Sequence, residues 1–308
     1  MTCNFTISGY ILSRLHEIGI RHLFGVPGDY ILDFLDNVVA SPIEWVGNCN
    51  ELNAGYSADG YARLNGAGAA AVTYGVGGFS ILNAVAGAFA ERVPLIVISG
   101  APPAARRKSG ALVHHLVSDY YLQLDLFKKI TACAVILTDP ACAPDEIDRA
   151  IRNCVVKKLP VYLELPADMA NAPCLAPGLW PDDVSLVSDE ESLAECVEEA
   201  ARLFNNAERP LVLAGVELLR FGLGGETLNL VETAEVPFAT MLSSKAALPE
   251  MHPQFVGIYQ GGWSRETVCR QVEESDCLLS LGVWHTDLDT GLFSVNLDNR
   301  RTIAAAGE

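Results

Sequence analysis

Short apolar runs alternate with segments of helical periodicity along the first 170 residues. After Thr6, apolar residues recur at Ile7, Ile11, Leu15 and Ile18, a spacing that places them on one face of a helix. Runs short enough to be buried strands follow at 22–25, 43–47, 69–74, 94–99, 133–137 and 161–165. Strands that alternate with helices form a parallel sheet covered on both faces. The pattern therefore predicts a three-layer α/β domain.

A second α/β unit is predicted after a segment rich in Pro, Ala and Asp. Ser188 is expected to cap an acidic helix that ends near Asn205. Strands are predicted at 211–214, 236–241, 277–281 and 293–297. We assign residues 1–170 to the first domain, 171–188 to a linker, and 189–308 to a second, Rossmann-like three-layer domain without a nucleotide. The chain stops close to the last predicted strand of that domain, so it is expected to be truncated there.

Local signals predict where helices and loops begin in the first domain. Asp29 follows a strand and is expected to cap a helix. Ser80 is expected to cap a helix that runs to Glu91, after a glycine-rich turn. Residues 100–115 are expected to form a loop.

Composition narrows the class of protein. The formal net charge of −17 argues against a nucleic-acid or anionic-membrane partner, because both attract basic surfaces. The nine cysteines include no C-x-x-C pair, so we expect reduced thiols in a cytoplasmic protein. No signal peptide or apolar run of about 18 residues is found. The six histidines lack zinc-like spacing, and no metal ligand is predicted in this chain.

Nucleotide-binding motifs are absent from the sequence. The glycine-rich turn Gly75, Val76, Gly77 and Gly78 fails G-x-G-x-x-G because Ser80 occupies the position of the last glycine. No G-x-x-x-x-G-K-[ST] sequence occurs. We therefore predict neither a dinucleotide fingerprint nor a P-loop.

Polar residues instead follow or end several predicted strands. They are Asp29, Glu51, Thr73, the turn at 75–78 and the adjacent pair His114 and His115. Open parallel sheets place their sites at the carboxyl ends of strands, so these groups are expected to meet at one edge. Glu51 and the histidines also have a simpler interpretation: Glu51 as a first-turn charge favoured by the helix dipole, and the histidines as exposed loop residues.

Four motifs together resemble the first domain of thiamine-diphosphate-dependent 2-keto acid decarboxylases, the pyruvate and indolepyruvate decarboxylase group. They are Gly25-Val26-Pro27-Gly28-Asp29, Asn50-Glu51-Leu52-Asn53-Ala54 with Ala58-Asp59-Gly60-Tyr61-Ala62-Arg63, Thr73 with Gly75-Val76-Gly77, and His114-His115. The segments 245–253 and 257–261 resemble that group's middle domain. The resemblance covers essentially the whole chain and implies a pyrimidine-binding domain followed by a middle domain.

The resemblance implies specific roles. Glu51 matches the glutamate that bonds the aminopyrimidine ring, while Asp29, His114 and His115 match acid–base groups. Thr73, Gly75, Val76 and Gly77 match residues that line the pyrimidine. The substrate would be a small 2-keto acid. The first domain would also mediate self-association.

One family element is missing. The third domain of these enzymes anchors the diphosphate through Mg²⁺ with a Gly-Asp-Gly-Ser signature, which this sequence lacks. We therefore expect a split enzyme, inactive until a companion polypeptide supplies that domain. The alternatives are a fragment of a longer protein, a carboligase that forms an acyloin-type carbon–carbon bond, and a non-catalytic binding subunit.

Overall fold

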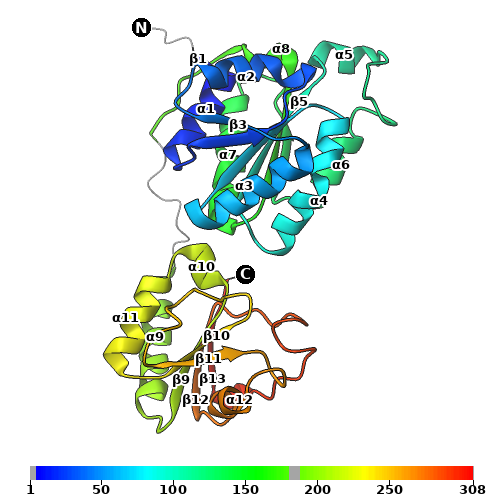
Figure 1. Cartoon of the computed structure of the whole chain (residues 1–308). Helices are drawn as coiled ribbons and strands as arrows, with labels where there is room; N and C mark the ends of the chain where they lie inside the picture. The colour runs from blue at the N-terminus through cyan, green and yellow to red at the C-terminus, as the bar shows by residue number, and fades with distance from the viewer. Residues whose placement is uncertain (1–4, 180–187, 308) are drawn as a thin grey trace. The chain divides into compact units, whose positions relative to one another are not determined.

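The computed structural model describes residues 5–179 and 188–307. The chain divides into two compact units, residues 1–186 and 187–308, which are described separately below (Figure 1). Within the described residues, no helix is both long and apolar enough to cross a membrane.

The first unit is built on a six-stranded parallel sheet in the order β3-β2-β4-β5-β7-β6. Its strands are β2 (His22–Gly25), β3 (Glu44–Gly47), β4 (Gly68–Val72), β5 (Leu95–Ala101), β6 (Cys133–Ile136) and β7 (Val161–Pro166). Every residue of β4, β5 and β7 is buried, as expected for strands covered on both faces. The six strands predicted from the apolar runs are confirmed.

Helices cover both faces of this sheet (Figure 1). One core contains residues of α1 (Ile7–Glu17), α2 (Leu32–Val39), α7 (Ala143–Lys157) and α8 (Ala167–Ala170). The other contains residues of α3 (Glu51–Asn65), α4 (Val76–Ala90) and α6 (Leu122–Phe127). The predicted three-layer α/β architecture is confirmed.

A short antiparallel pair lies apart from the main sheet. Strand β1 (Phe5–Thr6) pairs with β8 (Pro173–Cys174). Strand β8 falls inside the segment 171–188 that was expected to be a linker, so part of that segment is fastened to the first unit. Residues 180–187 lie outside the described residues.

Three local predictions were wrong in the first unit. Asp29 does not cap a helix with its side chain; it is the first residue of the 3-10 turn η1 (Asp29–Ile31). Ser80 lies inside α4, which begins at Val76 because Gly75, with φ of +66°, turns the chain directly from β4 into the helix. The expected loop at 100–115 contains the end of β5 and helix α5 (Ala104–Ser109).

The second unit contains a five-stranded parallel sheet in the order β11-β10-β9-β12-β13. Its strands are β9 (Pro210–Ala214), β10 (Phe238–Met241), β11 (Phe255–Tyr259), β12 (Cys277–Leu281) and β13 (Thr302–Ala305). One core draws on α9 (Glu190–Asn205), α10 (Glu217–Phe221) and α11 (Gly224–Ala234), and the other on α12 (Glu266–Glu273). A 3-10 turn, η2 (Asn299–Arg301), precedes β13.

Two predictions for this unit were wrong. The cap of α9 is Asp189, whose carboxylate accepts a hydrogen bond from the Ser192 amide, and not Ser188. The last strand is β13 rather than 293–297; Val295 and Leu297 from that run pack against the core without joining the sheet. Phe293 is exposed, and Val295 and Leu297 are only partly buried, so the alternating pattern here comes from a loop that rests on the core.

In the second sheet, the segments that follow β9 and β12 pack closely against each other. Such folds bind nucleotides where strand order reverses, which here is beyond β9 and β12. A side chain at Gly215 would overlap the Gly282 backbone, so these segments touch directly. The buried Glu217 carboxylate accepts hydrogen bonds from Trp284 Nε1 at 2.9 Å and the Gly307 amide at 2.6 Å.

We predict that Gly100→Ala destabilises the first unit by several kcal/mol. A Cβ at Gly100 would overlap the Tyr30 carbonyl of η1, and backbone cannot yield as a flexible side chain does. Gly60→Ala is the control, because a Cβ there meets nothing within 4 Å and replaces glycine in a helix. The free energy of unfolding of this control should rise by roughly 0.5–1 kcal/mol. Urea unfolding of both variants tests the prediction, and equal midpoints would contradict it.

Candidate active site

The carboxyl edge of the first sheet gathers the predicted polar residues. Asp29 follows β2, Glu51 opens α3 after β3, and Thr73 follows β4. Asn50 holds the start of α3 by accepting a hydrogen bond from the Leu52 amide at 2.8 Å. Parallel pairing of β2 with both β3 and β4 is what brings these three strand ends together.

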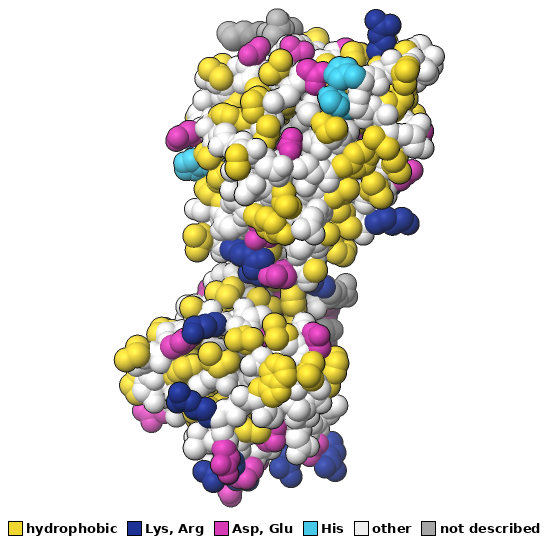
Figure 2. All heavy atoms as spheres, turned by 45° about the vertical axis from the view of Figure 1, so that its right-hand side comes forward, with side chains coloured by type: hydrophobic (Ala, Val, Ile, Leu, Met, Phe, Trp, Pro, Cys, Tyr) yellow, Lys and Arg dark blue, Asp and Glu magenta, His cyan; other side chains and the backbone are white. Residues whose placement is uncertain are grey.

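Asp29, His114 and His115 form one cluster at this edge. Oδ2 of Asp29 hydrogen-bonds Nε2 of His114, and Oδ1 accepts a hydrogen bond from the Thr73 hydroxyl at 3.3 Å. The rings of His114 and His115 meet edge to face with centroids 4.7 Å apart. The Asp29 and His114 side chains are 46% and 59% exposed, so solvent and small molecules reach them. Figure 2 shows two histidine side chains side by side at the surface of the first unit, next to an acidic side chain.

Tyr30 is a member of this cluster that was not foreseen from the sequence. Its ring stacks on His114 with centroids 4.8 Å apart, and its hydroxyl lies 3.1 Å from Nδ1 of His114. Its place directly after Asp29 was the only available signal. Tyr30 therefore fixes the imidazole plane from one side while Asp29 holds it from the other.

The Asp29–His114 interaction changes the acidity of the carboxyl. Burial raises the pKa of Asp29, but the hydrogen bond and charge of His114 outweigh it. Smaller contributions come from the Tyr30 amide and the Thr73 hydroxyl, and the net pKa lies below its ordinary value. Asp29 therefore ionises more readily than an ordinary aspartate, and its carboxylate holds the His114 ring through their hydrogen bond.

Glu51 lies at the other end of the site, beside the first turn of α4. A Cβ built on Gly77 would lie 3.4 Å from Glu51 Oε1 and 3.1 Å from the Thr73 methyl group. The absence of a side chain at Gly77 thus leaves space between Glu51 and Thr73. Among the described residues, no contact joins Glu51 to the Asp29–His114–His115 cluster, and Thr73 lies between the two. The Val76 side chain is half exposed at the start of α4.

Gly75 connects the turn to the histidine pair. A side chain at Gly75 would overlap the His115 carbonyl and Cβ, so the two backbones are in direct contact. Gly75 and His115 both have positive φ, +66° and +64°. The structure thus brings all the predicted site residues to one edge, as two groups that share Thr73 and the Gly75–Gly77 turn.

The cluster also has the spacing of a metal site. One ligand atom from each of Asp29, His114 and His115 lies within 4.8 Å of the others. Two imidazoles and a carboxylate suit transition metals better than Mg²⁺, which prefers oxygen ligands. Asp29 and His114 already hydrogen-bond to each other within this group.

Two parallel-sheet α/β units, the first with a carboxylate, an Asp–His–His cluster and a glycine turn at its carboxyl edge, define the class of this protein. Residues 5–123 match the family model for the thiamine pyrophosphate enzyme N-terminal TPP binding domain. Residues 197–305 match the central domain of the same enzymes. The chain belongs to the thiamine pyrophosphate enzyme family.

Named relatives are similar over nearly the whole chain. An alpha-keto-acid decarboxylase of Mycobacterium leprae (strain TN) is 39% identical over 302 residues, 97% of this chain and 53% of that protein. A pyruvate decarboxylase of Aspergillus fumigatus is 38% identical over 301 residues, 96% of this chain and 53% of that protein. The resemblance to the 2-keto acid decarboxylase group is confirmed. The chain spans about half the length of these relatives.

We predict that the stability contribution of Asp29 disappears in acid. A carboxyl whose pKa is lowered on folding stabilises the protein above its unfolded pKa of about 3.9, and this is lost as the pH falls through the lower folded pKa. Because both side chains are partly exposed, the advantage of wild type over Asp29→Asn at pH 7 should stay below about 1 kcal/mol. Denaturant unfolding at pH 7 and pH 3 measures it. Asp36→Asn, which removes an exposed charge on α2, is the control; an identical pH dependence in both variants would refute the interaction.

Proposed function

We propose that this chain carries the pyrimidine half of a thiamine diphosphate site and acts in the decarboxylation of a small 2-keto acid. The observation that carries the proposal is the space at Gly77, which a Cβ would fill, opening between the Glu51 carboxylate and Thr73. The acid–base cluster of Asp29, His114 and His115 at the same edge supports it. So do relatives named alpha-keto-acid and pyruvate decarboxylases.

The residues at the two ends of the site would perform different tasks. Glu51 would accept a hydrogen bond from the aminopyrimidine ring, with Thr73 and the Gly75–Gly77 turn lining it. The cofactor, when bound, supplies an electron sink for the bond to the departing carboxylate. His114 and His115 would hold or deliver protons beside the substrate, since imidazole exchanges protons near neutral pH. Asp29 would keep the ring of His114 oriented through their hydrogen bond.

The diphosphate and its Mg²⁺ would be held outside these 308 residues. Mg²⁺ prefers oxygen ligands, and the Asp29–His114–His115 cluster offers two nitrogens and only one carboxylate. We place them on a companion polypeptide in a hetero-oligomer that also self-associates through the first unit. The eight cysteines among the described residues are all free, which supports a reducing, cytoplasmic location.

We predict that the isolated chain, supplied with thiamine diphosphate and Mg²⁺, releases no CO₂ from pyruvate or from longer 2-keto acids. Adding a companion chain that contains Gly-Asp-Gly-Ser should restore release, because the two halves of the site would then meet. Coupled aldehyde detection measures turnover, and chromatography for acyloins reports carboligation instead. Turnover by the chain alone would refute the hypothesis of a split enzyme. A lack of turnover with every companion chain encoded beside it would refute the hypothesis that a second polypeptide completes the site.

Glu51→Gln should lower kcat of the completed enzyme by at least about 10²-fold, the usual scale for losing a positioned proton-transfer group. The fold should be unaffected, because the amide replaces the carboxylate at the same size. Glu266→Gln is the matched control: Glu266 is also an acidic residue opening a helix, but it lies in α12 of the second unit. Near-normal turnover of Glu51→Gln would remove the role assigned to Glu51.

A further inference from the structure

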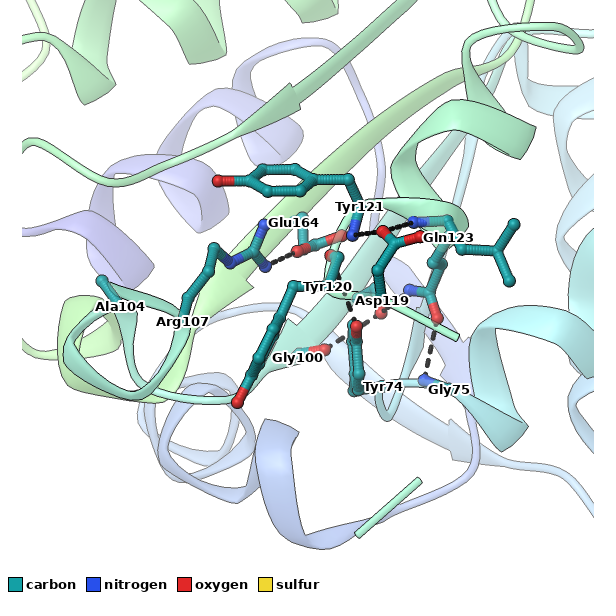
Figure 3. Close-up of polar contacts among 12 residues, drawn as sticks. Tyr74, Gly75, Gly100, Ala104, Arg107, Asp119, Tyr120, Tyr121, Gln123 and Glu164 are labelled. Atoms are coloured by element: carbon teal, nitrogen blue, oxygen red, sulfur yellow. Dashed lines mark hydrogen bonds and ion pairs between the residues drawn. The ribbon is translucent and has the colours of Figure 1, made fainter. Parts of the chain in front are cut away.

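A line of buried hydrogen bonds starts at Gly75, in the turn that contacts His115. The Gly75 amide donates to Oε1 of Gln123 at 2.8 Å (Figure 3). Nε2 of Gln123 donates in turn to the Tyr162 hydroxyl at 2.6 Å and the Ser99 hydroxyl at 2.9 Å. Gln123 is 1% exposed, so it has no water to replace these partners. The sequence carries no signal for this glutamine, which belongs to the unpredicted helix α6.

The line continues to a buried ion pair. Tyr162 donates its hydroxyl hydrogen to Oε2 of Glu164 at 2.8 Å. Arg107 Nη2 pairs with the other carboxylate oxygen of Glu164 (Figure 3). The side chains of Glu164 and Arg107 are 0% and 6% exposed. Burial raises the pKa of Glu164, while the charge of Arg107 and the Tyr162 hydroxyl oppose that rise. The line therefore runs from the Gly75 amide through Gln123 and Tyr162 and ends at the Glu164 carboxylate.

The ion pair is costly as a purely stabilising device. Nε and Nη1 of Arg107 are buried and have no hydrogen-bond partner among the described residues. The guanidinium is otherwise flanked by the rings of Tyr120 and Tyr121, 5.8 and 5.2 Å away (Figure 3). A half-satisfied buried pair is seldom more stable than apolar packing of the same volume. We therefore ask which neighbouring segments the Arg107–Glu164 pair holds in place.

The ion pair and Gln123 act on both ends of the candidate site, the glycine turn beside Glu51 and the segment with His114 and His115. The Gln123 side chain packs directly on the Gly78 backbone, and Gly75 contacts His115. Arg107 lies in α5, at the start of the segment that carries His114 and His115. The line thus ties the glycine turn beside Glu51 and the histidine segment to the same point of the sheet, strand β7.

We propose that Gln123 is a positioning residue, held by Tyr162, Glu164 and Arg107, that fixes the Gly75–Gly77 turn against His115. This rests on the proposed function for its catalytic consequence, but its structural content can be tested in the chain alone. Without the line, the turn and the histidine pair would move relative to one another although each remained folded.

The test is Tyr162→Phe, which removes the hydroxyl between Gln123 and Glu164 and keeps the ring that stacks on Phe127 at 4.0 Å. Tyr10→Phe is the matched control. Tyr10 is equally buried, and its hydroxyl also donates to a carboxylate, Asp148, at 2.8 Å beside an arginine, but it lies in the core on the opposite face of the sheet.

In the isolated chain, hydrogen exchange by NMR should show the Gly75 amide of Tyr162→Phe exchanging at least about tenfold faster than in Tyr10→Phe at matched global stability. The NMR chemical shifts of the His114 and His115 ring protons should change in Tyr162→Phe and not in the control. Equal exchange rates and unchanged ring-proton shifts would overturn the proposal. If Tyr162→Phe fails to fold, Ser99→Ala, which removes the other hydroxyl partner of Gln123, should give the same changes on a smaller scale.

In the completed enzyme, Tyr162→Phe should lower kcat more than it raises KM and should displace the pH profile. Changed exchange in the isolated chain together with an active Glu51→Gln enzyme would refute the proposed function and leave the positioning role standing. Unchanged exchange with an inactive Glu51→Gln enzyme would refute the positioning role and leave the proposed function standing.

Discussion

The pairings of the six-stranded sheet all run in one direction, and this constraint decides where chemistry can occur in the first unit. Parallel strands require a crossover after each strand, so each chain segment leaves the sheet at the same edge. β2, β3 and β4 therefore deliver Asp29, Glu51 and Thr73 to neighbouring positions. If one strand were reversed, its polar residue would lie at the far edge of the sheet.

Glycines determine how closely the delivered groups approach. Gly75 ends the short turn that leads from β4 into α4 and touches His115, while Gly77 leaves room beside Glu51. The resulting site is divided, with a carboxylate at one end and an Asp–His–His cluster at the other. This division matches the two kinds of proton chemistry that the proposed reaction requires, because an anionic hydrogen-bond acceptor and a neutral-pH proton carrier need different surroundings.

The sequence was sufficient to predict the sheet of the first unit and the meeting of its polar residues, because both follow from alternating periodicity and parallel topology. It was not sufficient for features that depend on contacts between distant segments. Asp29 and Ser80 are both residue types that commonly cap helices. The Asp29 carboxylate instead bonds His114, and Ser80 lies inside α4 because the turn at Gly75 starts that helix earlier. Gln123 was invisible because its partners, Gly75, Ser99 and Tyr162, come from three separate parts of the chain.

The pairing of β1 with β8 has a practical consequence for anyone who handles this protein. Strand β1, among the first described residues, pairs with β8 in the segment that follows β7 and α8, so this strand pair joins the beginning and the end of the described first unit. A bulky fusion placed before residue 5 would lie next to this strand pair and could disrupt it. A purification tag is therefore better attached elsewhere when the exit segment is to remain undisturbed, and proteolytic trimming of the first six residues would loosen the chain after β7 as well as its beginning.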